Sequence, residues 1–130
     1  MDIKKLSQIA KALVHAQKGI LAADESSNTI KKRFDSIEVE SNESNRQIYR
    51  EMLFKTEGIS DFISGIILFD ETIRQNGVDG KSLVSLIIQQ GMIPGIKVDM
   101  GAKPLAGSVE ETVTEGLDGL RERLEEYSQL

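Results

Sequence analysis

The chain has 130 residues, with 16 basic and 21 acidic side chains, a net charge of −5, one histidine and no cysteine. This length is near the usual size of one domain. Without cysteine there is no disulfide framework, zinc ribbon or thiolate nucleophile, and one histidine cannot build a His-rich metal site. The acidic balance disfavours nucleic acid, and no apolar run approaches the ~20 residues of a membrane span. We therefore expect a soluble cytoplasmic protein that uses no metal.

The N-terminal segment predicts a helix followed by a strand. Apolar residues recur at helical spacing over Ile3–Val14, which indicates an amphipathic helix ended by Gly19. The run Ile20–Ala23 is short, continuous and apolar, and it stops at the charged residues Asp24 and Glu25. A buried strand followed by a polar loop fits this pattern.

The segment Asn42–Lys55 predicts a second amphipathic helix. Ser44 with Gln47 three residues later matches a capping box, the pattern of a helix start. Its Arg and Glu residues are expected to face outward or toward a site. Apolar contacts are expected from the residues Ile48, Met52 and Phe54.

Two further apolar runs follow. Ile63–Phe69 is rich in β-branched residues and is cut off by the acidic pair Asp70–Glu71. A helical stretch over Leu83–Ile88 separates it from the third run, Met92–Val98, which contains Lys97 and ends at Asp99. Both runs predict buried strands.

The last part of the chain predicts a loop and a terminal helix. Residues Ala102–Gly107 have the composition of a loop, and Ser108 and Thr112 each begin a capping pattern with a glutamate three residues later. Apolar residues at helical spacing follow over Leu117–Tyr127. The helix is therefore expected to start near these caps.

Three strands separated by helices are typical of α/β proteins. Strands that are apolar on both faces belong to parallel sheets covered by helices. Chemistry in such folds gathers at the carboxyl ends of the strands. These ends hold charged side chains here, namely Asp24, Asp70, Glu71, Lys97 and Asp99.

The charged strand ends offer candidate chemistry. Lys97 and Asp24 form the most informative pair, because a lysine at the end of a buried strand needs a partner. Such a pair could bind phosphate or carbonyl oxygens, and the lysine could form an imine with a ketone substrate. Hydroxyl and basic residues after Asp24 suit an anion at a helix start, although a capped helix with a solvated basic face explains them too. These residues are Ser26, Thr29, Lys32 and Arg33. His15 is interpreted as a surface or boundary residue.

Several motifs in order along the chain resemble class I fructose-bisphosphate aldolase. They are Lys18–Ser26, Lys32-Arg33, Asn45-Arg46, Gly65–Phe69 with Glu71-Thr72, Gly95–Asp99 and Thr114–Leu120. The resemblance implies a (β/α)8 barrel and a glycolytic lyase. Its reaction is the reversible cleavage of fructose 1,6-bisphosphate to dihydroxyacetone phosphate and glyceraldehyde 3-phosphate through a lysine imine, without metal or other cofactor.

The resemblance also assigns roles to single residues. Asp24 matches the aspartate that orients substrate hydroxyls, and Lys97 matches a lysine that supplies positive charge beside the substrate and does not form the imine. Contacts at one substrate phosphate are assigned to Ser26, Thr29, Lys32, Arg33 and Arg46. The partner is thus a sugar phosphate, fructose 1,6-bisphosphate or fructose 1-phosphate, and relatives form homo-tetramers.

Family members are more than twice as long as this chain. The imine-forming lysine, the glutamate acid–base and later phosphate contacts fall in strands after the matched segment. We therefore expect residues 1–130 to be the N-terminal part of a single aldolase barrel domain, covering about three strands, and to be inactive as an isolated polypeptide. Two alternatives stay open: a noncatalytic, aldolase-derived interaction protein, and a receiver-type signalling domain, which requires five strands.

Overall fold

The structure is a computed structural model that describes residues 2–14 and 17–130. His15 therefore lies outside the described residues. The chain divides into two compact units, Met1–Ile96 and Lys97–Leu130. Each unit is described by itself.

The first unit is a small parallel sheet with helices. Its strands are β1 (Gly19–Ala23), β2 (Ile63–Leu68) and β3 (Ile93–Ile96). Its helices are α1 (Ile3–Leu13), α2 (Ser27–Asp35), α3 (Glu43–Phe54), α4 (Ile59–Phe62), α5 (Asp70–Ile73) and α6 (Leu83–Gln89). The short helices α4 and α5 were not predicted from the sequence.

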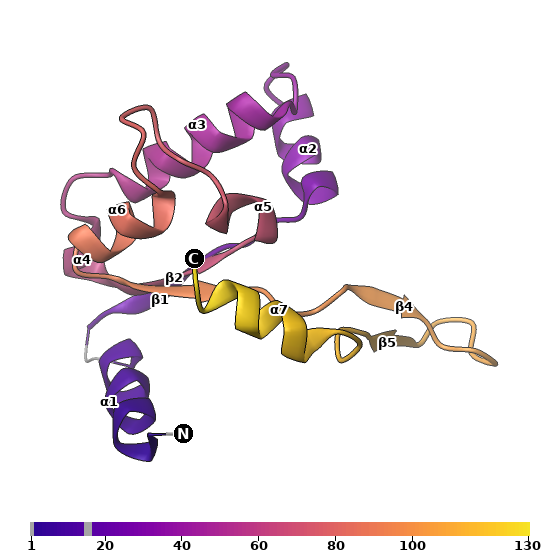
Figure 1. The fold of residues 1–130 in the computed structure, drawn as a ribbon. Helices are drawn as coiled ribbons and strands as arrows, with labels where there is room; N and C mark the ends of the chain where they lie inside the picture. The colour runs from indigo at the N-terminus through magenta and orange to yellow at the C-terminus, as the bar shows by residue number, and fades with distance from the viewer. Residues whose placement is uncertain (1, 15–16) are drawn as a thin grey trace. The chain divides into compact units, whose positions relative to one another are not determined.

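The three strands run parallel in the order β1-β2-β3, which confirms the predicted α/β architecture (Figure 1). Ala23 pairs with Leu68, which pairs with Ile96, so the last residues of all three strands lie in register. Parallel strands in register bring their carboxyl ends to one edge of the sheet. The residues that follow β1 and β2 therefore gather at the same edge.

The core lies between β2 and the helices. Ile66 and Leu68 of β2 are buried, as are Phe54 of α3 and Ile87 of α6. The opposite face of the sheet carries Ile20, which is 46% exposed. The prediction that β1 is a buried strand is therefore wrong for most of its length, because α3 and α6 cover the other face of the sheet.

Helix α1 confirms the predicted amphipathic helix, and its apolar side chains are not buried. Asp2 caps the helix by accepting a hydrogen bond from the main-chain N–H of Lys4 at 3.0 Å. Ile3 and Leu6 are exposed, and α1 has no buried residue. The helix ends at Leu13, before the expected stop at Gly19, which instead begins β1.

Helix α3 starts one residue after its true cap, Asn42. The side-chain oxygen of Asn42 accepts a hydrogen bond from the N–H of Asn45 at 2.9 Å. The predicted capping box of Ser44 and Gln47 is therefore wrong. The Gln47 amide instead donates to Glu51, one turn further along the helix, at 2.5 Å.

The buried face of α3 is largely charged. Ile48 and Met52, which were expected to make apolar contacts, are 52% and 58% exposed. Arg50 and Glu51 are buried, together with the expected Phe54. Helical spacing identified the helix but not its buried face, because Arg50 finds its acceptors at Ala23 and Glu25 and Glu51 accepts the main-chain N–H of Val78, all distant in the sequence.

Helix α6 confirms the predicted helix between the second and third strands. Ser82 caps it by accepting a hydrogen bond from the N–H of Ser85 at 3.1 Å. Gly91 follows the helix with φ of 79°, a left-handed conformation that glycine adopts without strain. Leu83 and Ile87 are fully buried.

The second unit contains a β-hairpin and a helix. The strands β4 (Ala102–Pro104) and β5 (Thr112–Thr114) pair antiparallel, and α7 (Leu120–Tyr127) follows. The predicted loop at Ala102–Gly107 is therefore partly a strand. The helix begins at Leu120, well after the predicted caps.

The predicted helix cap at Ser108 lies in the turn of the hairpin and not at a helix start. The Ser108 hydroxyl accepts a hydrogen bond from the N–H of Glu111 at 3.2 Å, but within the turn of the hairpin. The β-branched run Thr112–Thr114 then favours an extended strand over a helix. Helix α7 instead starts after Gly119, whose φ is 64°.

Candidate functional site

The carboxyl end of β1 continues directly into the first turn of α2. Asp24 is the first residue after the strand, and Ser26 is the N-cap of α2. The Ser26 hydroxyl lies 3.1 Å from the Thr29 hydroxyl instead of capping a main-chain N–H. Hydroxyl groups and main-chain N–H groups at the positive end of a helix suit an anion such as a phosphate.

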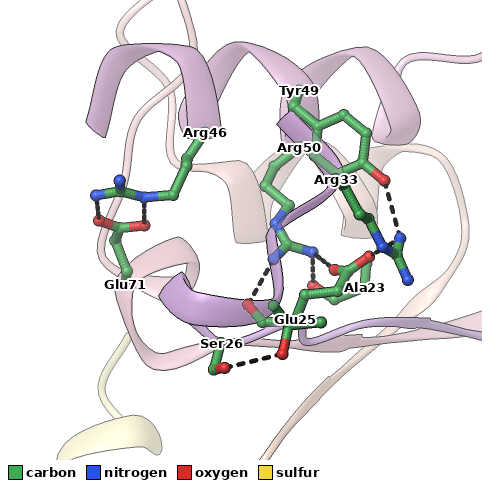
Figure 2. Close-up of polar contacts among 9 residues, drawn as sticks. Ala23, Glu25, Ser26, Arg33, Arg46, Tyr49, Arg50 and Glu71 are labelled. Carbon is green, nitrogen blue, oxygen red and sulfur yellow. Dashed lines mark hydrogen bonds and ion pairs between the residues drawn. The ribbon is translucent and has the colours of Figure 1, made fainter. Parts of the chain in front are cut away.

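Arg33 and Lys32 lie further along the same helix, and both are exposed. Arg33 forms an ion pair with Glu25, just after β1, and also donates to the Tyr49 hydroxyl at 3.5 Å (Figure 2). Its side chain is 58% exposed, so the guanidinium is open to solvent on one side. The structure thus brings Asp24, Ser26, Thr29 and Arg33 to one strand end.

Arg50 of α3 binds the residues at the end of β1, and the sequence analysis did not predict it as a site residue. Its side chain is 2% exposed. One terminal nitrogen donates to the main-chain oxygen of Ala23 and to the carboxylate of Glu25, and the other donates to the main-chain oxygen of Glu25 at 2.9 Å. The guanidinium carbon lies 5.7 Å from the centroid of the Tyr49 ring. Phe34 of α2 meets that ring edge-on.

Glu25 also went unselected, although it stands beside Asp24 in the sequence. Its carboxylate is 8% exposed and binds both Arg33 and Arg50. A buried carboxylate requires such partners, because an unpaired buried charge is strongly unfavourable. Glu25 therefore couples the end of β1 to α2 and α3.

Arg46 lies one helical turn before Arg50 and meets the end of β2. Its guanidinium binds Glu71 of α5 through two hydrogen bonds and donates to the main-chain oxygen of Ser41 at 2.6 Å. The hydrogen bond to Glu71 raises the pKa of Arg46 above its usual range. In this chain the predicted phosphate contact Arg46 is thus paired with a carboxylate, and its role toward a phosphate stays a prediction.

One signal in the sequence could have identified Arg50. Residues four positions apart lie on the same face of a helix. Arg46, selected by resemblance, therefore places Arg50 beside it on α3. The sequence does not show that this face is buried. The apolar residues Ile48 and Met52 instead predicted that another face of the helix points inward.

Lys97 is the first residue after β3 and belongs to the second unit. Its ammonium binds the carboxylate of Asp99, which also accepts the main-chain N–H of Gly101 at 2.9 Å. The hydrogen bond from Lys97, followed by the one from Gly101, holds the pKa of Asp99 below its usual range. The structure thus supplies a carboxylate partner for Lys97 two residues away. The predicted pairing of Lys97 with Asp24 stays a prediction.

In residues 2–14 and 17–130, no three His, Asp or Glu side chains are grouped so that they could hold a metal ion. Over those same ranges, every helix is too short or too polar to cross a lipid bilayer.

The in-register parallel strands with helices define an α/β protein, a class in which ligands commonly bind at the carboxyl ends of the strands. The sequence model of the family "Fructose-bisphosphate aldolase class-I" matches residues 5–130. The chain belongs to the class I fructose-bisphosphate aldolase family. The alternative of a receiver-type signalling domain is therefore set aside.

Similar proteins come from distant organisms. The chain is 57% identical over 127 residues to a probable fructose-bisphosphate aldolase class 1 of Xanthomonas campestris, covering 98% of this chain and 38% of the relative. It is 53% identical over 124 residues to fructose-bisphosphate aldolase 2 of Plasmodium berghei, covering 95% of this chain and 34% of the relative. The chain thus spans little more than a third of the length of these relatives.

A solved structure also matches. The fructose-bisphosphate aldolase of Plasmodium falciparum, crystallised with TRAP and a small-molecule inhibitor, has a TM-score of 0.93 and 51% identity. The match covers 97% of this chain and 36% of the solved chain. The α/β fold with parallel strands is therefore that of an aldolase segment.

Proposed function

We propose that the protein carrying these residues is a class I fructose-bisphosphate aldolase. It reversibly cleaves fructose 1,6-bisphosphate to dihydroxyacetone phosphate and glyceraldehyde 3-phosphate through a lysine imine. The observation that carries the proposal is the similarity of nearly the whole chain, at 57% identity, to a relative named for this activity. By analogy with glycolytic aldolases, the protein is cytoplasmic and forms a homo-tetramer.

In this proposal residues 1–130 form the N-terminal part of one (β/α)8 barrel domain and supply its first three strands. The strand order β1-β2-β3 supports it, since neighbouring strands of such a barrel follow one another in sequence. The coverage of the solved aldolase, 36% of its chain, agrees with three strands out of the eight that make up such a barrel.

The proposed site uses the residues at the strand ends. The carboxylate of Asp24 accepts hydrogen bonds from substrate hydroxyls and so orients the sugar. The first turn of α2, with Ser26 and Thr29, receives one phosphate, because its N–H groups and hydroxyls donate to phosphate oxygens. Arg33 and Lys32 add positive charge from the same helix, and Arg46 adds it from α3.

Lys97 supplies a fixed positive charge in the proposed site. Its ammonium is oriented by Asp99, and Gly101 in turn holds that carboxylate. A lysine placed in this way attracts substrate oxygens and stabilises negative charge that develops on them. It is not the imine-forming nucleophile of the proposal, which the family resemblance places in a strand after the matched segment.

A retro-aldol assay with borohydride trapping tests the proposal. The complete gene product should release triose phosphates from fructose 1,6-bisphosphate in the presence of a chelator. Borohydride added with dihydroxyacetone phosphate should leave one covalent adduct per subunit, because it reduces an imine to a stable amine. The polypeptide 1–130 alone should show neither turnover nor adduct.

The outcomes separate the proposals. Loss of turnover on chelation would overturn the lysine mechanism. Turnover or an adduct on residues 1–130 alone would overturn the placement of the imine lysine. If the complete gene product neither turns over nor traps substrate, the alternative of a noncatalytic, aldolase-derived interaction protein takes the place of the enzyme.

A further inference from the structure

We infer that Arg50 is a positioning residue, which fixes the main chain on both sides of Asp24. This inference deepens the proposed function and rests on it for the role of Asp24 toward substrate. The geometry of Arg50 itself does not depend on that role.

The guanidinium of Arg50 binds main-chain oxygens on both sides of Asp24. Asp24 stands between Ala23 and Glu25, and the main-chain oxygens of both neighbours accept hydrogen bonds from Arg50 (Figure 2). The two carbonyl groups stand before and after Asp24, with the main-chain rotations of Asp24 and Glu25 between them, so binding both restricts the rotations that would move the Asp24 side chain. A guanidinium is planar and presents its donors in a rigid fork, which makes this restriction directional.

The surroundings of Arg50 keep the fork in place. The side chain is 2% exposed, and its charge is balanced by the Glu25 carboxylate, which is itself almost fully buried. The face of Tyr49, whose ring centroid is 5.7 Å from the guanidinium carbon, covers it further. A buried charge with these hydrogen bonds cannot change position without losing them, which is costly inside a protein.

The same network reaches the proposed phosphate contact. Glu25 binds Arg50 with one carboxylate oxygen and Arg33 with the other. Arg50 therefore positions the hydroxyl-binding residue through the main chain and the phosphate-binding residue through Glu25. Loops that follow strands are ordinarily among the more mobile parts of a protein, so the order of this one depends on such contacts.

The test compares Arg50→Lys with Glu51→Gln in the complete gene product. Lysine keeps the charge but lacks the planar fork, so it cannot bind both main-chain oxygens in the same geometry. Glu51 is the next residue of α3, is also buried, and binds Lys55 and the main-chain N–H of Val78 instead of β1. It therefore controls for loss of a buried ionic contact on the same helix.

Two readouts are measured at temperatures where each variant is folded. Hydrogen–deuterium exchange of a peptide containing Asp24 and Glu25 should be about 10-fold faster or more in Arg50→Lys, since hydrogen bonds to a charged group are lost. It should be unchanged in Glu51→Gln. In the aldolase assay, Arg50→Lys should lower kcat about 10-fold or more while KM changes much less, because misplacing the group that orients the substrate slows the chemical step.

The outcomes are distinguishable. Unchanged exchange in Arg50→Lys, or an equal increase in Glu51→Gln, would overturn the positioning role. Inactivity of the unmodified protein would overturn the proposed function, while the exchange data would still decide the role of Arg50.

If Arg50→Lys does not fold, nitrogen-15 arginine NMR of the unmodified protein decides the role instead. Slow rotation of the Arg50 guanidinium, with separate signals for its terminal N–H groups, supports it. One averaged signal, as expected for the exposed Arg121, would overturn it.

Discussion

Arg46 binds both carboxylate oxygens of Glu71, with Nε 2.8 Å from Oε2 and Nη2 2.5 Å from Oε1. The two residues are 25 positions apart in the sequence, and the pair joins α3 to α5 at the end of β2. Arg50, one turn along α3, makes the corresponding contacts at the end of β1. Two arginines on one helix face thus hold the ends of neighbouring strands (Figure 2).

The pair of Arg46 and Glu71 should show measurable coupling. A double-mutant cycle of Arg46→Met and Glu71→Gln, followed by urea unfolding, is expected to give about 1–2 kcal/mol, because the pair is bidentate and only partly exposed. The more exposed pair Lys31–Asp35 on α2 is the control and should give at most about 0.5 kcal/mol. Additive single effects of Arg46 and Glu71 would contradict the prediction.

Replacement of Glu25 should destabilise the first unit. In Glu25→Gln the charge of the buried Arg50 loses its partner, and an uncompensated buried charge costs about 3–5 kcal/mol. Chemical denaturation followed by circular dichroism measures the change. The exposed Glu57→Gln serves as a control and should stay within about 0.5 kcal/mol of the unmodified protein. Similar values for the two variants would show that the Arg50–Glu25 contact adds nothing to stability.

Glu51 should make stability depend on acid pH. The hydrogen bond from Lys55, helped by those from Val78 and Gln47, holds the pKa of Glu51 below its usual range. The ionised form is thus favoured in the folded state, so its contribution is complete above the unfolded pKa of about 4.3 and is lost as pH falls through the lower folded pKa.

Unfolding free energies measured from pH 7 to pH 3 test this dependence. The difference between the unmodified protein and Glu51→Gln should be constant from pH 7 to about pH 5 and should shrink below about pH 4. The exposed Glu57→Gln supplies the background pH dependence. A difference that grows on acidification would mean that the pKa of Glu51 is raised.

Gly65 in the central strand should not tolerate a side chain. A Cβ there would lie 2.6 Å from Leu13 Cδ2 and 2.9 Å from the main-chain oxygen of Ile93, and the second contact cannot move without shifting β3. Gly65→Ala is expected to cost about 1–3 kcal/mol. At Gly95 the nearest atom is 3.5 Å away, so Gly95→Ala should be neutral or slightly stabilising. Equal effects in thermal unfolding would contradict the close packing of α1 and β3 around Gly65.

The strands and most helices could be predicted because their signals are local. Continuous apolar runs identified β1, β2 and β3, and each run ends where charged residues begin. The hairpin of the second unit was missed because short β-branched strands such as Thr112–Thr114 carry a weak pattern, while Ser108 offered a capping signal that the turn uses instead.

The sequence by itself determined the α/β class, the parallel strands, the family resemblance and the charged residues at the strand ends, because these depend on the order of neighbouring residues. Only the tertiary structure decided which side of α3 is buried and what Arg50 and Glu25 bind. The partners Ala23 and Arg50 are 27 positions apart, and no local pattern records such a contact. Burial of an arginine depends on acceptors from other elements, and folding alone brings them within reach.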